Sequence, residues 1–111
     1  MLNTHGMAKE PVQLSSHKID NTPLGDGPAK SPVVPPCVYI EGYILSFEAY
    51  HSDYALNIKD EDGNVVFTTT VWSAQTEVVL PSSLSGDYEI NLVMGDWLFT
   101  GWISLNIGDY D

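Results

Sequence analysis

The strongest constraint on the fold comes from residues 82–93, where a turn leads into alternating apolar and polar side chains. Tyr88, Ile90 and Leu92 occupy every second position, and Glu89 and Asn91 lie between them. Successive side chains of a β-strand point to opposite sides of its sheet, so this alternation is typical of a strand with one buried face. We therefore predict a turn over residues 81–85, followed by a half-buried strand.

The chain from residue 37 onward repeats this pattern. Further strands are predicted at residues 37–41, 43–49, 54–59, 65–72, 76–80 and 97–105. Glycine-containing turns at residues 41–42, 60–64 and 95–96 separate several of them, since glycine readily adopts the positive φ of tight turns. The side chains predicted to face the core are Val38, Ile40, Leu45, Phe47, Leu56, Ile58, Val78, Leu80, Trp97, Phe99, Ile103 and Leu105. About seven short strands without a helical period predict an all-β, antiparallel sandwich.

Residues 1–36 have a different composition. Residues 1–8 lack periodicity, and residues 9–20 show a short alternation that predicts an edge strand, because Pro11 lacks the N–H of an interior strand. Residues 21–36 contain five prolines and two glycines and are predicted to form a linker. We expect an N-terminal edge strand and proline-rich linker over 1–36 and the sandwich core over 37–111, together forming one domain.

The spacing of Leu84, Gly86 and Tyr88 is similar to a corner of immunoglobulin-type sandwiches, in which a tyrosine locks a crossing loop. Other motifs extend this similarity over most of the chain, at residues 10–14, 35–40, 44–47, 56–67, 86–90 and 98–103. In this order they resemble a family of small Ig-like domains of unknown function in secreted proteins of Bacteroides-type gut bacteria. The resemblance implies an immunoglobulin-like fold and export to the periplasm or cell surface. It implies no activity, cofactor or catalytic residue.

Charge and hydropathy restrict the partners. Fifteen acidic residues against four basic ones give a formal net charge of −11, which repels the phosphates of nucleic acids and anionic lipids. The sequence contains no run of about 18 apolar residues, so no membrane-spanning helix is predicted. Residues 1–10 lack the basic start and apolar middle of a secretory signal, so the expected secreted, periplasmic or cell-surface location rests on the resemblance.

Residues that carry chemistry are few and scattered. Cys37 is the single cysteine, which excludes an internal disulfide, and we expect it to be a small buried hydrophobic residue. His5, His17 and His51 are far apart in the sequence and predict no catalytic triad with it.

Two sets of oxygen-bearing side chains also have a simpler interpretation. Asp60, Asp62 and Asn64 alternate like the start of a calcium loop, but the glycine falls at position four and Val71 takes the place of the required glutamate. A hairpin turn fits this segment better. A glycosidase needs two carboxylates at a suitable separation, one of them buried. The four carboxylates that could supply such a pair are predicted to lie outward or in loops: Glu41, Glu48, Asp53 and Glu77. We therefore predict no catalytic residue, no metal site, no cofactor and no enzymatic activity.

Aromatic side chains are the remaining candidates for a binding surface. Trp72 and Trp102 fall on strand faces opposite the predicted core, and Tyr50 lies in a predicted loop. Exposed aromatic side chains stack on sugars or form protein interfaces. In the alternative interpretation these rings are not exposed, because the linker or the N-terminal strand covers some of them, as large aromatic side chains are mostly buried. We predict a non-enzymatic secreted or cell-envelope module that binds a protein or glycan there. The alternative is a sorting or structural module that pairs with a partner's strand, because the weak N-terminal strand would leave a sheet edge open.

Overall fold

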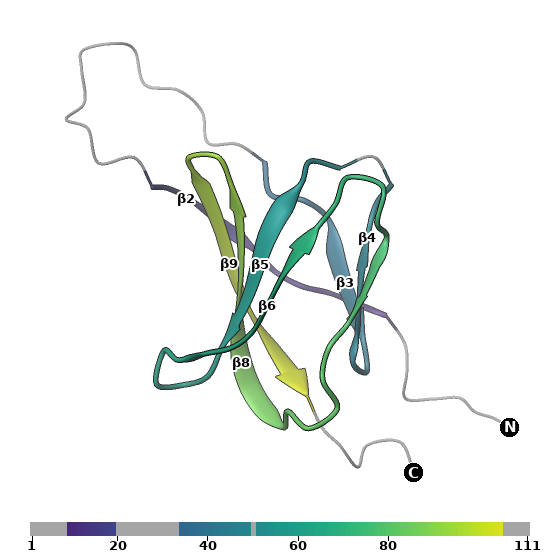
Figure 1. Cartoon of the computed structure of the whole chain (residues 1–111), viewed down its shortest axis with the longest axis vertical. Coiled ribbons are helices and arrows are strands. Elements are labelled where there is room, and N and C mark those ends of the chain that lie inside the picture. The colour runs from purple at the N-terminus through teal and green to yellow at the C-terminus, as the bar shows by residue number, and fades with distance from the viewer. Residues whose placement is uncertain (1–8, 20–33, 50, 106–111) are drawn as a thin grey trace, which may run out of the picture.

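The computed structural model describes residues 9–19, 34–49 and 51–105, which form two antiparallel β-sheets packed face to face (Figure 1). One sheet has the order β1 (Glu10–Pro11), β3 (Val38–Glu41), β4 (Ile44–Phe47), β7 (Glu77–Val79). The other has the order β2 (Ser15–Lys18), β9 (Trp97–Leu105), β8 (Gly86–Met94), β5 (Tyr54–Lys59), β6 (Val65–Val71). This confirms the predicted all-β, immunoglobulin-like antiparallel sandwich, with nine strands in the described residues instead of about seven.

The core lies between the two sheets and is built from every second residue of the longer strands. Its fully buried side chains include Leu45 from β4, Leu56 and Ile58 from β5, and Ile90 and Leu92 from β8. Burying one such side chain contributes roughly 1.5–3 kcal/mol, so these inward positions dominate the stability of the fold. The predicted inward face of each long strand is therefore confirmed.

The N-terminal segment passes from one sheet to the other. β1 pairs with β3, and β2 pairs with β9, so the single edge strand predicted over residues 9–20 is in fact two short strands at two different edges. The segment crosses β9 at Gly101, where a Cβ would collide with the carbonyl oxygen of Gln13 and touch the Val12 and Leu14 side chains. The missing side chain of Gly101 thus leaves room for the crossing.

A corner formed by two tyrosines fixes the loop before β8. The Tyr88 hydroxyl donates to the carbonyl of Ser85 at 3.1 Å and accepts from its N–H at 3.0 Å. The Tyr43 hydroxyl donates to the carbonyl of Leu84 at 2.6 Å. The predicted tyrosine lock is confirmed, since both residues bind the backbone of the segment that leads from β7 to β8.

Cys37 is exposed, so the prediction that it is buried was wrong. The neighbouring Val38 takes the inward position at the start of β3, and alternation then turns Cys37 outward. Residues 1–8, residues 21–33 of the predicted linker, Tyr50 and residues 106–111 lie outside the described residues.

Candidate functional site

Trp72 and Trp102 are both exposed over 61% of their surface, so the predicted position opposite the core is confirmed and the described residues do not cover either ring. Trp102 lies on the outer face of the five-stranded sheet, in a row that continues through Glu89 and Lys59 to Val65. Trp72 directly follows β6, seven residues beyond Val65. At about 3.3 Å per residue, the two rings are roughly 20 Å apart along the strands. The structure therefore does not bring them into one surface.

Around Trp102, the three central strands present a grid of nine outward side chains, which we call the outer-face grid. It comprises Leu98, Thr100 and Trp102 from β9, Val93, Asn91 and Glu89 from β8, and Ala55, Asn57 and Lys59 from β5. Directly opposite side chains in antiparallel strands have Cβ atoms about 4.5–5.5 Å apart. The eight residues around the buried Asn91 are half-buried or exposed, and they lie close enough together to contact one ligand.

The middle row of the grid is polar and extends across the sheet. Thr100 lies opposite Asn91, Asn91 opposite Asn57, and Asn57 opposite Thr68 of β6. The Thr68 hydroxyl donates to Asn57 Oδ1 at 2.8 Å, and His17 Nε2 lies 3.1 Å from the Thr100 hydroxyl oxygen. These contacts orient the side chains at both ends of the row.

Asn91 lies at the centre of this grid and is only 4% exposed. Its side-chain amide donates to the carbonyl of Ile90 at 3.1 Å. An amide has two donor hydrogens and one acceptor oxygen, so this bond uses only part of its capacity. Sequence reasoning predicted that Asn91 faces outward and did not single it out. Its importance follows from the register, which places three polar neighbours on one line.

The row through Trp102 combines three different chemistries. It offers the flat face of an indole, the carboxylate of Glu89 and the ammonium of Lys59 on adjacent strands. Glu89 and Lys59 are both half-buried, so their side chains line the surface. These three groups have the chemistry to stack on an apolar ring face and to hydrogen-bond to hydroxyl groups beside it.

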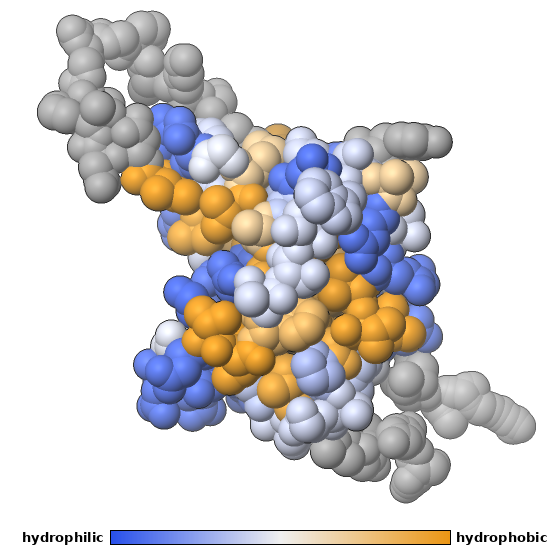
Figure 2. Space-filling view, viewed as in Figure 1, coloured by the Kyte–Doolittle hydropathy of each residue, from blue (hydrophilic) through white to orange (hydrophobic). Residues whose placement is uncertain are grey.

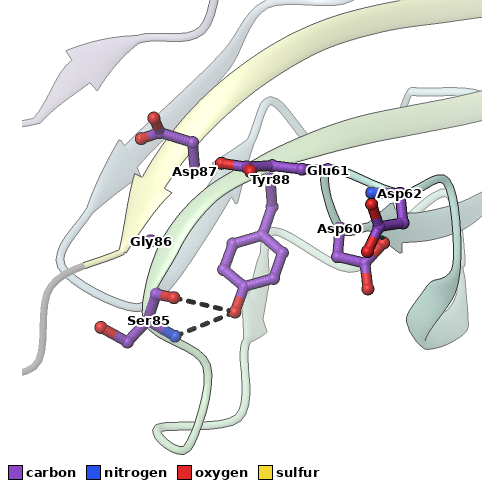
Figure 3. A pocket seen from close by; sticks show the side chains of 7 residues that line it. All are labelled: Asp60, Glu61, Asp62, Ser85, Gly86, Asp87 and Tyr88. Atoms are coloured by element: carbon purple, nitrogen blue, oxygen red, sulfur yellow. Dashed lines mark hydrogen bonds between the residues drawn. The ribbon is translucent and has the colours of Figure 1, made fainter.

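A second candidate is a hollow of about 300 Å³ between the β5–β6 hairpin and the start of β8 (Figure 3). It is lined by Asp60, Glu61, Asp62, Ser85, Gly86, Asp87 and Tyr88. In the close view the carboxylate of Asp87 points away from those of Asp60 and Asp62. Asp87 accepts a hydrogen bond from the Ser104 hydroxyl at 2.8 Å on the outer face. The acidic groups therefore do not converge.

Asp60 is engaged in the hairpin turn. Its Oδ1 accepts the backbone N–H groups of Asp62 and Asn64, both at 2.9 Å, and the Gly63 N–H bonds to the Asp60 carbonyl at 3.0 Å. These bonds, led by the backbone bond from Asn64, lower the pKa of the Asp60 carboxyl. The predicted hairpin turn is confirmed, and Gly63 supplies its positive φ of 86°.

The other groups considered for chemistry stay apart. Of the four carboxylates, Glu48, Asp53 and Glu77 are exposed and Glu41 is half-buried, and Asp53 accepts a 2.7 Å bond from the Ser73 N–H. Across residues 9–19, 34–49 and 51–105, no three His, Cys, Asp or Glu side chains are grouped to hold a metal ion. In the same residues, no helix has the length and apolar character to cross a membrane.

Comparison with known proteins gives no match to a family model, a curated protein or a solved structure. The assignment of a function therefore rests on the fold and on the outer-face grid.

Proposed function

We propose that this protein is a non-enzymatic binding module that holds a glycan on its outer-face grid. The observation that carries the proposal is Trp102, an indole exposed on a sheet face beside an ordered polar row. Exposing a large aromatic ring to water is unfavourable, so a ring held in this way is a common anchor of binding surfaces.

A sugar ring suits this surface because it has an apolar face of C–H groups and a rim of hydroxyls. The apolar face stacks on an indole, and the hydroxyls both donate and accept hydrogen bonds. Next to Trp102 the grid supplies the half-buried hydroxyl of Thr100 and carboxylate of Glu89, while the buried amide of Asn91 lies beneath them. The grid thus combines a stacking platform with donors and acceptors.

The proposal includes a location in the cell envelope or outside the cell, as the family resemblance implies. An acidic surface suits that environment when the ligand is a neutral polysaccharide, which carries no charge to be repelled. Fractionation of the source cells tests this part. Recovery of the natural protein from the cytoplasm would contradict it.

The two equally exposed tryptophans provide a matched test of the site. We expect soluble oligosaccharides that bind the wild-type protein to bind Trp102→Ala at least about 10-fold more weakly in calorimetry, while Trp72→Ala retains its affinity. Soluble, monovalent ligands exclude effects of avidity.

The proposal would be wrong if no glycan in a broad panel bound at high protein concentration. It would also be wrong if the two substitutions weakened binding equally. If the protein bound no glycan but captured a protein from envelope extract, and Trp102→Ala abolished that capture, the same surface would bind a protein instead of a glycan.

The alternative predicted from the sequence, a sheet completed by a partner's strand, assumed an edge left open by the N-terminal strand. That strand instead pairs with β3 and β9 through β1 and β2. The open edge that favours strand pairing lies elsewhere, at β6.

A further inference from the structure

The edge strands of the two sheets are protected to very different degrees. β1 has two residues and includes Pro11, β7 has three and begins with Glu77, and β2 has four and ends with Lys18. Short length, proline and charge are the usual devices that prevent an edge from pairing with another chain. β6 has seven residues, Val65–Val71, with no charge, no proline and no glycine.

β6 therefore exposes an unguarded row of backbone groups. Within residues 9–19, 34–49 and 51–105 it pairs with β5 alone, so half of its N–H and C=O groups point away from the sheet formed by these residues. Its residues are β-branched or aromatic, which favours extended pairing. A bulge sets Val66 out of register, and the regular part of the edge runs from Phe67 to Val71.

We propose that β6 pairs antiparallel with β6 of a second copy of this chain, about a two-fold axis at Thr69. The regular stretch is self-complementary in this register. Phe67 falls opposite Val71 of the second copy, Thr68 opposite Thr70, and Thr69 opposite Thr69. Aromatic with β-branched pairs and threonine pairs are both favourable across antiparallel strands.

The same register accounts for exposed apolar side chains at both ends of β6. Trp72, 61% exposed, directly follows the regular stretch, so the antiparallel arrangement brings it near Val65 and Val66 of the second copy, which are 51% and 39% exposed. Val65 and Val66 begin β6, directly after the hydrophilic β5–β6 hairpin, and Figure 2 shows an apolar patch beside a strongly hydrophilic one in this region. Because the interface is two-fold symmetric, pairing covers this set of side chains at both of its ends.

The charge distribution permits this arrangement despite the net charge of −11. The acidic hairpin of residues 60–62 precedes β6, so the antiparallel register places the two hairpins at opposite ends of the interface. The register places the uncharged residues 72–74 of the other copy opposite residues 64–66 at the base of each hairpin, whereas the acidic Asp53, which bonds to Ser73, and Glu77 lie close by. The remaining long-range repulsion is screened by salt, and we expect the dimer to strengthen as ionic strength rises.

Sedimentation velocity over roughly 10 µM to 1 mM measures this pairing directly. We expect the wild-type protein to shift from monomer towards dimer, and Thr69→Lys to stay monomeric because two like charges would meet at the axis. Val79→Lys is the matched control, since Val79 is 67% exposed on the other sheet's edge strand β7 and the change of charge is identical. Both substitutions make the chain less acidic, so a loss of dimer in Thr69→Lys alone cannot come from added net repulsion.

A cross-link tests the register without weakening the interface. In a Cys37→Ser background, Thr69→Cys is expected to form a disulfide-linked dimer under mild oxidation, because the two side chains lie directly opposite each other. Thr70→Cys alone is the control, because position 70 faces position 68 of the second copy. Circular dichroism and urea unfolding establish that each variant is folded before it is compared.

Three outcomes would overturn the proposal. These are a wild-type protein that remains monomeric over the whole range at high salt, equal dimerisation of the two lysine variants, and equal cross-linking of the two cysteine variants.

Discussion

At the scale of single residues, the Tyr88 hydroxyl holds the corner before β8 by bonding to both polar groups of Ser85. Tyr88→Phe keeps the ring and removes both bonds. We expect it to lower the free energy of unfolding by about 0.5–1.5 kcal/mol, because the exposed Ser85 groups exchange their bonds to the tyrosine hydroxyl for bonds to water. Urea unfolding followed by fluorescence measures this change.

Tyr39→Phe is the control for that experiment. The Tyr39 ring is exposed on β3, and its hydroxyl has no hydrogen-bond partner among the described residues. Its loss should change stability by less than about 0.5 kcal/mol. Equal effects of the two substitutions would show that the corner hydroxyl adds nothing to the stability of the fold.

At the scale of elements, the crossing of the N-terminal segment over β9 depends on Gly101. Gly101→Ala places a methyl group where the Gln13 carbonyl lies, and backbone cannot give way as a flexible side chain can. We expect a loss of about 1–3 kcal/mol, with the crossing segment displaced before the rest of the sandwich. Hydrogen exchange then shows faster exchange at Ser15–Lys18 than in the wild-type protein.

Protection in β5 and β6 is the internal reference, because these strands pair with each other and neither is paired with β9, over which the segment crosses. A uniform rise in exchange across all strands would mean that the substitution weakens the whole fold and not the crossing. Unchanged exchange in β2 would show that the backbone at Gly101 accommodates the added methyl group without displacing the crossing segment.

The strands themselves could be predicted because each long one carries its own alternation. Leu56 and Ile58, or Ile90 and Leu92, identify a buried face without reference to any partner strand. The division of residues 9–20 between two sheets could not be predicted, since Val12 and Leu14 fit one strand as well as two. Nor could the exposure of Cys37, which depends on whether Cys37 or Val38 takes the first inward position.

The candidate site was predicted in part for a related reason. The outward position of Trp102 follows from alternation within β9 alone, and the structure confirms it. The line that joins Thr100, Asn91 and Asn57 depends on the register between three strands, two of which are far apart in the sequence. Local pattern does not encode that register, so the polar row emerges only from the folded sheet.

At the scale of the whole molecule, the two exposed tryptophans lie on separate surfaces. Trp102 belongs to the outer face, and Trp72 follows the edge strand β6. A dimer paired through β6 continues the five-stranded sheet across the two-fold axis, and the outer faces of both copies lie on one side. Two grids on one side would bind a long polysaccharide with greater avidity than a single grid.

The net charge of −11 also acts on the molecule as a whole. With four basic residues against fifteen acidic ones, screening by salt removes more repulsion than attraction. Raising the NaCl concentration from roughly 20 mM to 0.5 M should therefore stabilise the fold and raise Tm by about 2–5 °C. Differential scanning calorimetry at low protein concentration measures this, because dilution limits the contribution of dimerisation to Tm.

Glu61→Lys distinguishes this electrostatic effect from a general action of the salt. Glu61 is exposed in the β5–β6 hairpin between Asp60 and Asp62, so the substitution reduces repulsion at little structural cost. The variant should be more stable than the wild-type protein at low salt, and the difference should narrow as salt is added. A difference that stays constant with salt, or a wild-type Tm that falls, would mean that repulsion among the carboxylates does not limit the stability of this sandwich.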